Sequence, residues 1–227
     1  MTAEAGMTTP YELVVLDLAG TTVVDDGIVE GAFTRAWDRV QRTDEGRAAA
    51  LKHVRDTMGQ SKIAVFRHFA DEETAQQINR EFERAYRELI DDGKCEAIPG
   101  AEDTVRALRD RGLKIAFTTG FATTTATAIL KALGWTDLAD VVLTPEDAGR
   151  GRPAPDLVLM SVIRTQTSSV AATVVVGDTE SDAASGRSAG AGLVVGVLTG
   201  SRDEATLRAG GADLVLASVA DLPAALP

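Results

Sequence analysis

The sequence predicts an α/β fold, in which a Rossmann-like doubly wound parallel sheet forms the core and an α-helical cap domain is inserted into it. Short runs of Val, Ile and Leu alternate with segments of helical spacing from residue 96 onward. Such alternation is typical of a parallel sheet that helices cover on both faces. One further apolar run, residues 13–16, lies near the N-terminus and ends at Asp17. Between these regions, residues 23–95 have helical spacing and no convincing strand.

The chain divides accordingly into three parts. Residues 1–10 are small and polar, and we expect a flexible N-terminus there. Residues 11–22 and 96–227 are predicted to form the core domain, and residues 23–95 the inserted cap. In the cap, apolar spacing predicts helices over 28–40, from Asp44 as N-terminal capping residue to Val54, from Ser61 through Phe66, and from Asp71 to Ile90.

The core elements follow one another with short connections. Predicted strands lie at 113–118, 141–143, 173–176 and 192–198, with a weak one at Leu214. Predicted helices lie at 102–111, 122–133, 155–165, 181–189, 205–209 and 219–225. Strands alternating with helices indicate right-handed crossovers and a single parallel sheet.

Charge and cysteine content exclude several classes of function. The formal net charge is −11, from 23 basic and 34 acidic residues, which argues against binding to nucleic acid or to anionic membranes. An acidic protein that handles an anionic substrate needs a local cation, either a metal ion or a placed Arg or Lys. Cys95 is the only cysteine, which excludes an internal disulfide. Without a signal-like start or an apolar run of roughly 18 residues, a cytoplasmic protein is expected.

Polar side chains follow the predicted strands at four places, residues 17–21, 118–120, 151–156 and 177–182. The carboxyl ends of parallel strands meet at one edge of a sheet, where such folds bind ligands. Clustered carboxylates repel one another, and oxygen ligands without His or Cys indicate Mg²⁺. A loop that opens a helix is suited to bind phosphoryl oxygens. The groups expected together are the carboxylates of Asp17, Asp178 and Asp182, the hydroxyls of Thr118 and Thr119, and the guanidinium of Arg152.

This ordered set of motifs resembles the haloacid dehalogenase superfamily from about Tyr11 to Leu226. The resemblance implies that Asp17 is the nucleophile and forms an aspartyl-phosphate. It also implies that Thr119 binds the phosphoryl group and that the cap closes over the site. The implied Mg²⁺ ligands are Asp17, the backbone carbonyl of Ala19, Asp178 and Asp182.

Two departures from the superfamily pattern narrow the expected chemistry. Most phosphatases of the superfamily have Asp where this chain has Ala19, and Lys where it has Arg152. Both departures are similar to the phosphonatases, the phosphonoacetaldehyde hydrolases, whose cap lysine forms a Schiff base with the substrate aldehyde. The corresponding segment here is 58–63, and the resemblance makes Lys62 that lysine. The residues expected to bind substrate are Gly20, Thr21, Thr118, Gly120, Met58 and Phe121.

The phosphonatase pattern is incomplete. Val65 stands where His is usual, Phe121 where Tyr is usual, and residues 23–28 lack the cysteine often found there. These differences predict a phosphonatase-like relative that cleaves the C–P bond of a different 2-oxoalkylphosphonate. They leave open which residue transfers protons, and His53 and His68 are candidates for this role only because they lie near enough in the chain. If the surrounding motif is left out of account, the alternative interpretation is that Lys62 is a solvated residue of a short helix and that Arg152 is a surface charge.

Two other functions stay open at this stage. One is a phosphatase of the same superfamily that acts on a small phosphomonoester without a Schiff base. The other is a non-catalytic metabolite-binding relative. The expected partner is a small phosphonate or phosphate, and a homodimer is possible.

Overall fold

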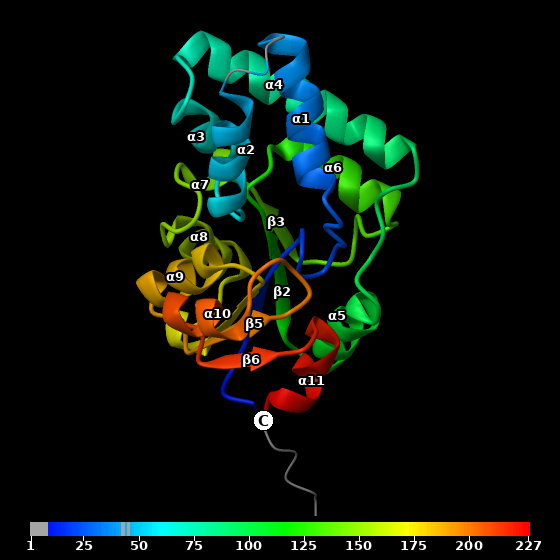
Figure 1. The fold of residues 1–227 in the computed structure, drawn as a ribbon. Helices are drawn as coiled ribbons and strands as arrows, with labels where there is room; N and C mark the ends of the chain where they lie inside the picture. The colour runs from blue at the N-terminus through cyan, green and yellow to red at the C-terminus, as the bar shows by residue number, and fades with distance from the viewer. Residues whose placement is uncertain (1–8, 42–43, 45) are drawn as a thin grey trace, which may run out of the picture.

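The core of the protein is one parallel sheet. The computed structural model describes residues 9–41, 44 and 46–227, and Figure 1 shows the fold. The strands are β1 (Leu13–Asp17), β2 (Lys114–Thr118), β3 (Val141–Leu143), β4 (Thr173–Gly177), β5 (Leu193–Val197) and β6 (Leu214–Leu216). Their order is β3-β2-β1-β4-β5-β6, and every neighbouring pair is parallel. The connections therefore change direction between β1 and β4, which is where doubly wound sheets bind ligands.

Helices cover both faces of this sheet. The core helices are α5 (Ala101–Asp110), α6 (Thr123–Ala132), α7 (Pro145–Ala148), α8 (Asp156–Thr165), α9 (Glu180–Ala189), α10 (Glu204–Gly210) and α11 (Leu222–Ala225), with 3-10 turns η1 (Val170–Ala172) and η2 (Val219–Asp221). Helices α8, α9 and α10 lie on one side and α5 and α11 on the other (Figure 1). Successive side chains of a strand point to opposite faces. Leu13 and Val15 accordingly pack with the first group, and Val14 and Leu16 with the second.

Four helices occupy the chain between β1 and α5, and we refer to them as the inserted helices. They are α1 (Ile28–Val40), α2 (Arg47–Asp56), α3 (Lys62–Arg67) and α4 (Glu72–Asp91), and they lie together at one end of the molecule (Figure 1). Aromatic rings join α1, α3 and α4, with ring centroids 5.9 Å apart for Phe33 and Phe66 and 5.6 Å apart for Phe66 and Phe82. The division into a core domain and a cap domain stays a prediction.

Most predicted elements form within one or two residues of their expected bounds, but the predicted cap at Asp44 was wrong and one short helix was not predicted. Helix α2 begins after Gly46, which has φ 76°, and the exposed Asp44 carboxylate pairs with the Arg47 guanidinium at 2.6 Å instead of capping the helix. Ser61 directly precedes α3, and its side chain makes no capping hydrogen bond. Helix α7 was not predicted, since four residues are too short to show a helical period. Residues 1–8 of the predicted flexible terminus lie outside the described residues.

None of the helices in the described part of the chain is long and apolar enough to cross a membrane.

Candidate active site

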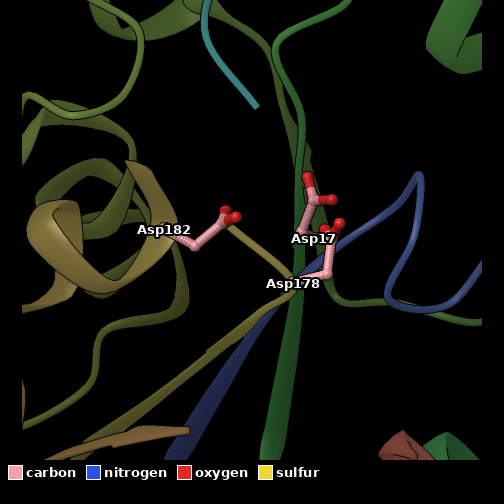
Figure 2. Close-up of side chains that lie close together, drawn as sticks. All are labelled: Asp17, Asp178 and Asp182. Carbon is pink, nitrogen blue, oxygen red and sulfur yellow. The ribbon is translucent and has the colours of Figure 1, made fainter. Parts of the chain in front are cut away.

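Three carboxylates meet at the carboxyl edge of the sheet, where its order changes direction. Asp17 is the last residue of β1 and lies opposite Thr118 of β2. Asp178 directly follows β4, and Asp182 lies in the first turn of α9. Figure 2 shows Asp17 and Asp178 beside each other, with Asp182 reaching toward them from α9. All three are buried, and one oxygen of each lies within 4.8 Å of the others.

The turn after Asp17 is built around the neighbouring carboxylate. Gly20 has φ 86°, a conformation that side chains disfavour, and a Cβ there would collide with the Asp178 carboxylate. The Thr21 hydroxyl donates to Asp178 Oδ1 at 3.2 Å, and the Thr22 hydroxyl donates to the Asp17 carbonyl at 2.9 Å. In this structure Thr21 therefore holds Asp178 in place, and Gly20 leaves room for its carboxylate; their predicted contact with substrate stays a prediction.

The carboxylate cluster creates a site for a cation. Burial, together with the neighbouring Asp17 carboxylate, raises the pKa of Asp178 to about 8. Two ionised carboxylates in one buried site repel each other, so a cation is needed to keep both charged. Three oxygen donors at this spacing fit a metal ion, and the Ala19 backbone borders the same cavity.

Arg152 supplies a fixed positive charge beside the cluster. Its guanidinium is buried, donates to Asp17 Oδ1 at 2.6 Å and also bonds Asp182 Oδ1. The surface interpretation of Arg152 is therefore wrong. Asp182 Oδ2 accepts from the Thr179 backbone N–H at 3.1 Å, which closes the first turn of α9. The predicted role of Asp182 in metal binding stays a prediction, because both of its oxygens have protein partners here.

The loop after β2 forms the other side of the site. Thr119 is buried, and its Oγ1 accepts the Phe121 N–H at 3.2 Å, which leaves the hydroxyl hydrogen available to another acceptor. Thr118 is buried within β2 and does not line the cavity. Gly120 meets the inserted helices so closely that a Cβ there would collide with the Gln60 carbonyl.

Lys62 reaches the same site from the inserted helices. It is the first residue of α3, its N–H donates to the Gly120 carbonyl at 3.1 Å, and its side chain is buried. The Nζ atom lies 5.2 Å from the centroid of the Phe121 ring. Burial lowers the pKa of Lys62 to about 8. The interpretation of Lys62 as a solvated residue is therefore wrong, and its amine is a chemically usable base near neutral pH.

One small cavity connects these groups. It encloses about 20 Å³, roughly the space of one water molecule, so the inserted helices are closed over the carboxylates. The predicted site residues that line it are Asp17, Ala19, Met58, Lys62, Thr119, Gly120, Phe121, Arg152 and Asp178. Gly20, Thr21, Thr118 and Asp182 lie behind that lining. Sequence reasoning missed Val29, Gly59 and Thr179, although the Thr179-x-x-Asp182 spacing is a recognisable helix-start signal.

His53, His68 and Cys95 do not line the cavity. The His53 and His68 rings stack on each other with centroids 3.9 Å apart, and neither lines the cavity. Burial raises the pKa of the Cys95 thiol to about 11. A raised thiol pKa leaves little of the reactive thiolate near neutral pH.

Comparisons with known proteins identify the family to which the chain belongs. A family model described as haloacid dehalogenase-like hydrolase matches residues 11–190. A phosphonoacetaldehyde hydrolase of Bacillus cereus (strain AH187) is 32% identical over 209 residues, covering 85% of this chain and 77% of that protein. A ribulose-1,5-bisphosphate 5-phosphatase of Halopiger xanaduensis is 36% identical over 93 residues, covering 41% of this chain and 39% of that protein. A solved hydrolase structure from Pseudomonas syringae superposes with TM-score 0.82 at 25% identity, covering 93% of this chain and 95% of that one.

The fold, the site and the family match define the class of protein. The chain belongs to the haloacid dehalogenase-like hydrolases and is an enzyme of that family. Within the family it is phosphonatase-like, since its similarity to the Bacillus cereus phosphonoacetaldehyde hydrolase extends over most of both chains.

Proposed function

We propose that the protein is a Mg²⁺-dependent hydrolase that cleaves the C–P bond of a 2-oxoalkylphosphonate such as phosphonoacetaldehyde. Phosphorus passes to Asp17 as an aspartyl-phosphate, while carbon is activated as an imine at Lys62. The observation that carries this proposal is the burial of the Lys62 amine in one cavity with Asp17 and Ala19. A nucleophile and an amine meet there, and the usual oxygen acid is missing.

The phosphoryl side of the reaction uses groups of the core. The Asp17 carboxylate attacks phosphorus, and the Thr119 hydroxyl and Arg152 bind the phosphoryl oxygens. Arg152 Nε is buried and has no hydrogen-bond partner among the described residues, which suits an oxygen acceptor supplied by substrate. Mg²⁺ would be held by Asp17, the Ala19 carbonyl, Asp178 and Asp182. When bound, it neutralises charge on the transferring phosphoryl group.

The Lys62 amine activates the carbon atom that leaves phosphorus. Lys62 Nζ attacks the carbonyl carbon of the substrate, and the resulting iminium withdraws electrons from the C–P bond. When that bond breaks, its electron pair forms an enamine, so no alkoxide leaves and no proton donor is needed at position 19. An amine at Lys62 therefore removes the need for an acid at position 19, where this chain has Ala19.

Reductive trapping tests the proposal. Borohydride added during turnover of phosphonoacetaldehyde with Mg²⁺ should leave a stable mass adduct on Lys62, located by peptide mapping. Lys62→Ala should lose both the adduct and phosphate release. Lys52→Ala, which changes an exposed lysine of α2 paired with Asp56, is the matched control and should keep both. Turnover by the wild type without an adduct at Lys62 would contradict the imine mechanism.

A second candidate is a phosphatase that acts on a small phosphomonoester without an imine. The local similarity to the Halopiger xanaduensis phosphatase favours it. It predicts Mg²⁺-dependent phosphate release from alkyl phosphates that persists in Lys62→Ala, so the same variant separates the two functions.

A further inference from the structure

A second cavity borders Lys62, and we refer to it as the side chamber. Its volume is about 40 Å³, roughly the space of two or three water molecules. The residues that line both this chamber and the cavity of Asp17 are Lys62, Gly120 and Phe121. Neither Asp17 nor Arg152 lines the side chamber. A group of the substrate that extends from Lys62 away from the phosphoryl site therefore has a space of its own.

The lining of the side chamber is partly apolar and partly polar. Its other apolar residues are Ile63, Ala122 and Pro145, and its other polar residues are Ser61, Asn79 and Glu146. Ser61 is buried, and its hydroxyl makes no hydrogen bond that caps α3. The apolar residues suit a methylene group, and the polar ones suit a hydrogen-bonding group attached to it.

Asn79 belongs to the inserted helices, but its position is fixed against the core. Its Nδ2 donates to Glu83 Oε1 at 2.6 Å, and the Thr124 hydroxyl of α6 donates to Glu83 Oε2 at 2.8 Å. The Glu83 carboxylate therefore joins Asn79 to a helix of the core. The Asn79 carbonyl oxygen takes no part in this connection and can accept a hydrogen bond from a ligand.

Glu146 gives the side chamber a negative charge. Its Oε2 accepts from the Thr123 hydroxyl at 2.5 Å, which orients the carboxylate and leaves Oε1 for another donor. Glu146 is exposed, so it lies where the chamber meets solvent. The oxygens of Asn79 and Glu146 favour a group that donates hydrogen bonds, and the charge of Glu146 disfavours an anionic group.

We propose that the side chamber receives a small hydrogen-bond-donating substituent on the carbonyl carbon of the substrate, such as a hydroxymethyl group. This inference rests on the proposed function and deepens it. When the carbonyl carbon is bonded to Lys62 Nζ, one of its substituents leads to phosphorus and Asp17. The other substituent can enter the adjoining chamber, whose volume suits two non-hydrogen atoms. The preferred substrate would then be a hydroxyketone phosphonate rather than the unsubstituted aldehyde.

A pair of ketones of equal size tests this preference. With the full-length Mg²⁺-loaded protein, phosphate release gives kcat/KM for 3-hydroxy-2-oxopropylphosphonate and for 2-oxobutylphosphonate, which has a methyl group in place of the hydroxyl. The ratio of the two values should be at least about tenfold in the wild type. The hydroxyl also makes the carbonyl more reactive, but this effect is the same in every variant, so the ratio is compared between variants.

Asn79→Leu should lower that ratio about tenfold, because the hydroxyl loses an acceptor. Gln76→Leu is the matched control and should keep the wild-type ratio. It removes a similar hydrogen bond of α4, from Gln76 Nε2 to Glu72 at 3.0 Å, and Gln76 does not line the chamber. An unchanged ratio in an Asn79→Leu variant that melts like the wild type would overturn the inference and leave the imine mechanism in place.

Glu146→Gln gives an independent test if Asn79→Leu proves unstable. It keeps an oxygen for the Thr123 hydroxyl and removes only the charge. It should raise kcat/KM for 3-phosphonopyruvate, relative to 2-oxobutylphosphonate, roughly fivefold. No rise would overturn the placement of the substituent beside Glu146. Failure of the wild type to release phosphate from any of these phosphonates or from phosphonoacetaldehyde would instead contradict the proposed function itself.

Discussion

The Arg152 guanidinium donates a hydrogen bond of 2.6 Å to Asp17, 135 residues away in the chain. Its other terminal nitrogen bonds Asp182, so one side chain fixes two of the three buried carboxylates. A planar guanidinium presents several donors in a fixed fork, whereas an ammonium is a single point charge. This geometry gives a physical reason for Arg at a position where the superfamily usually has Lys.

Two substitutions of Arg152 therefore test the effects of its charge and of its planar geometry separately. Arg152→Lys keeps the charge but cannot reach both carboxylates and a phosphoryl oxygen at once, so kcat should fall roughly 10²-fold. Arg152→Met leaves buried carboxylates without their partner and should lower the free energy of unfolding by about 3–5 kcal/mol. Steady-state phosphate release and urea unfolding measure the two effects. Equal activity in Arg152→Lys and the wild type would contradict the argument that the planar arrangement of donors in Arg152 is needed.

The buried amine of Lys62 should cost stability. Its pKa is lowered from 10.5 to about 8, so between pH 8 and 10.5 the unfolded chain binds more protons and stability rises with pH. Below pH 8 the full cost is present. Lys62→Met should therefore raise the free energy of unfolding by about 3 kcal/mol at pH 7, with a smaller gain at pH 10, while activity is lost. Urea unfolding at both pH values checks this, with Lys52→Met as the control; a Lys62→Met variant less stable than wild type at pH 7 would refute it.

We expect Mg²⁺ binding to offset the loss of folding stability that Asp178 causes as the pH rises. Its pKa is raised from 3.8 to about 8, so without metal its contribution to stability is lost as pH rises through that window. Mg²⁺ binding requires the ionised form and releases a proton. The increase in Tm caused by Mg²⁺ should therefore be larger at pH 8 than at pH 6 and absent in Asp178→Asn. Thermal melts in EDTA and in Mg²⁺ measure it, and an equal increase in the variant would place the ion elsewhere.

The contact between Gly120 and Gln60 should control closure of the inserted helices. Ala at position 120 would push Cβ into the Gln60 backbone carbonyl and displace Lys62, so kcat/KM should fall about 10²-fold. Gly31→Ala is the matched control, because it lies within α1 and its nearest atom is 4.0 Å away. That variant should keep its activity and gain about 0.5–1 kcal/mol of stability. Full activity in Gly120→Ala would show that this close contact is not needed.

The sequence predicted the sheet and its edge because both depend on short-range patterns. Apolar runs such as 173–176 identify buried strands, and the parallel topology then brings Asp17 and Asp178 together. The depth of Lys62 could not be predicted, because it depends on docking of α3 against Gly120, 58 residues further along the chain.

Restoring the missing carboxylate should change which bond the enzyme can break. Ala19 lines the cavity beside Asp17 and Lys62, so Ala19→Asp places an acid where most phosphatases of the superfamily have one. Alkyl phosphates need a proton on the departing oxygen, whereas aryl phosphates with acidic leaving groups do not. The variant should therefore hydrolyse an alkyl phosphate roughly 10²-fold faster than the wild type, with little change for 4-nitrophenyl phosphate. Its C–P cleavage should fall, because an ionised carboxylate at position 19 would stabilise the Lys62 ammonium and slow its attack. Ala19→Asn controls for size and should gain no alkyl phosphatase activity; a gain in that variant equal to the gain in Ala19→Asp would show that the acid is not responsible.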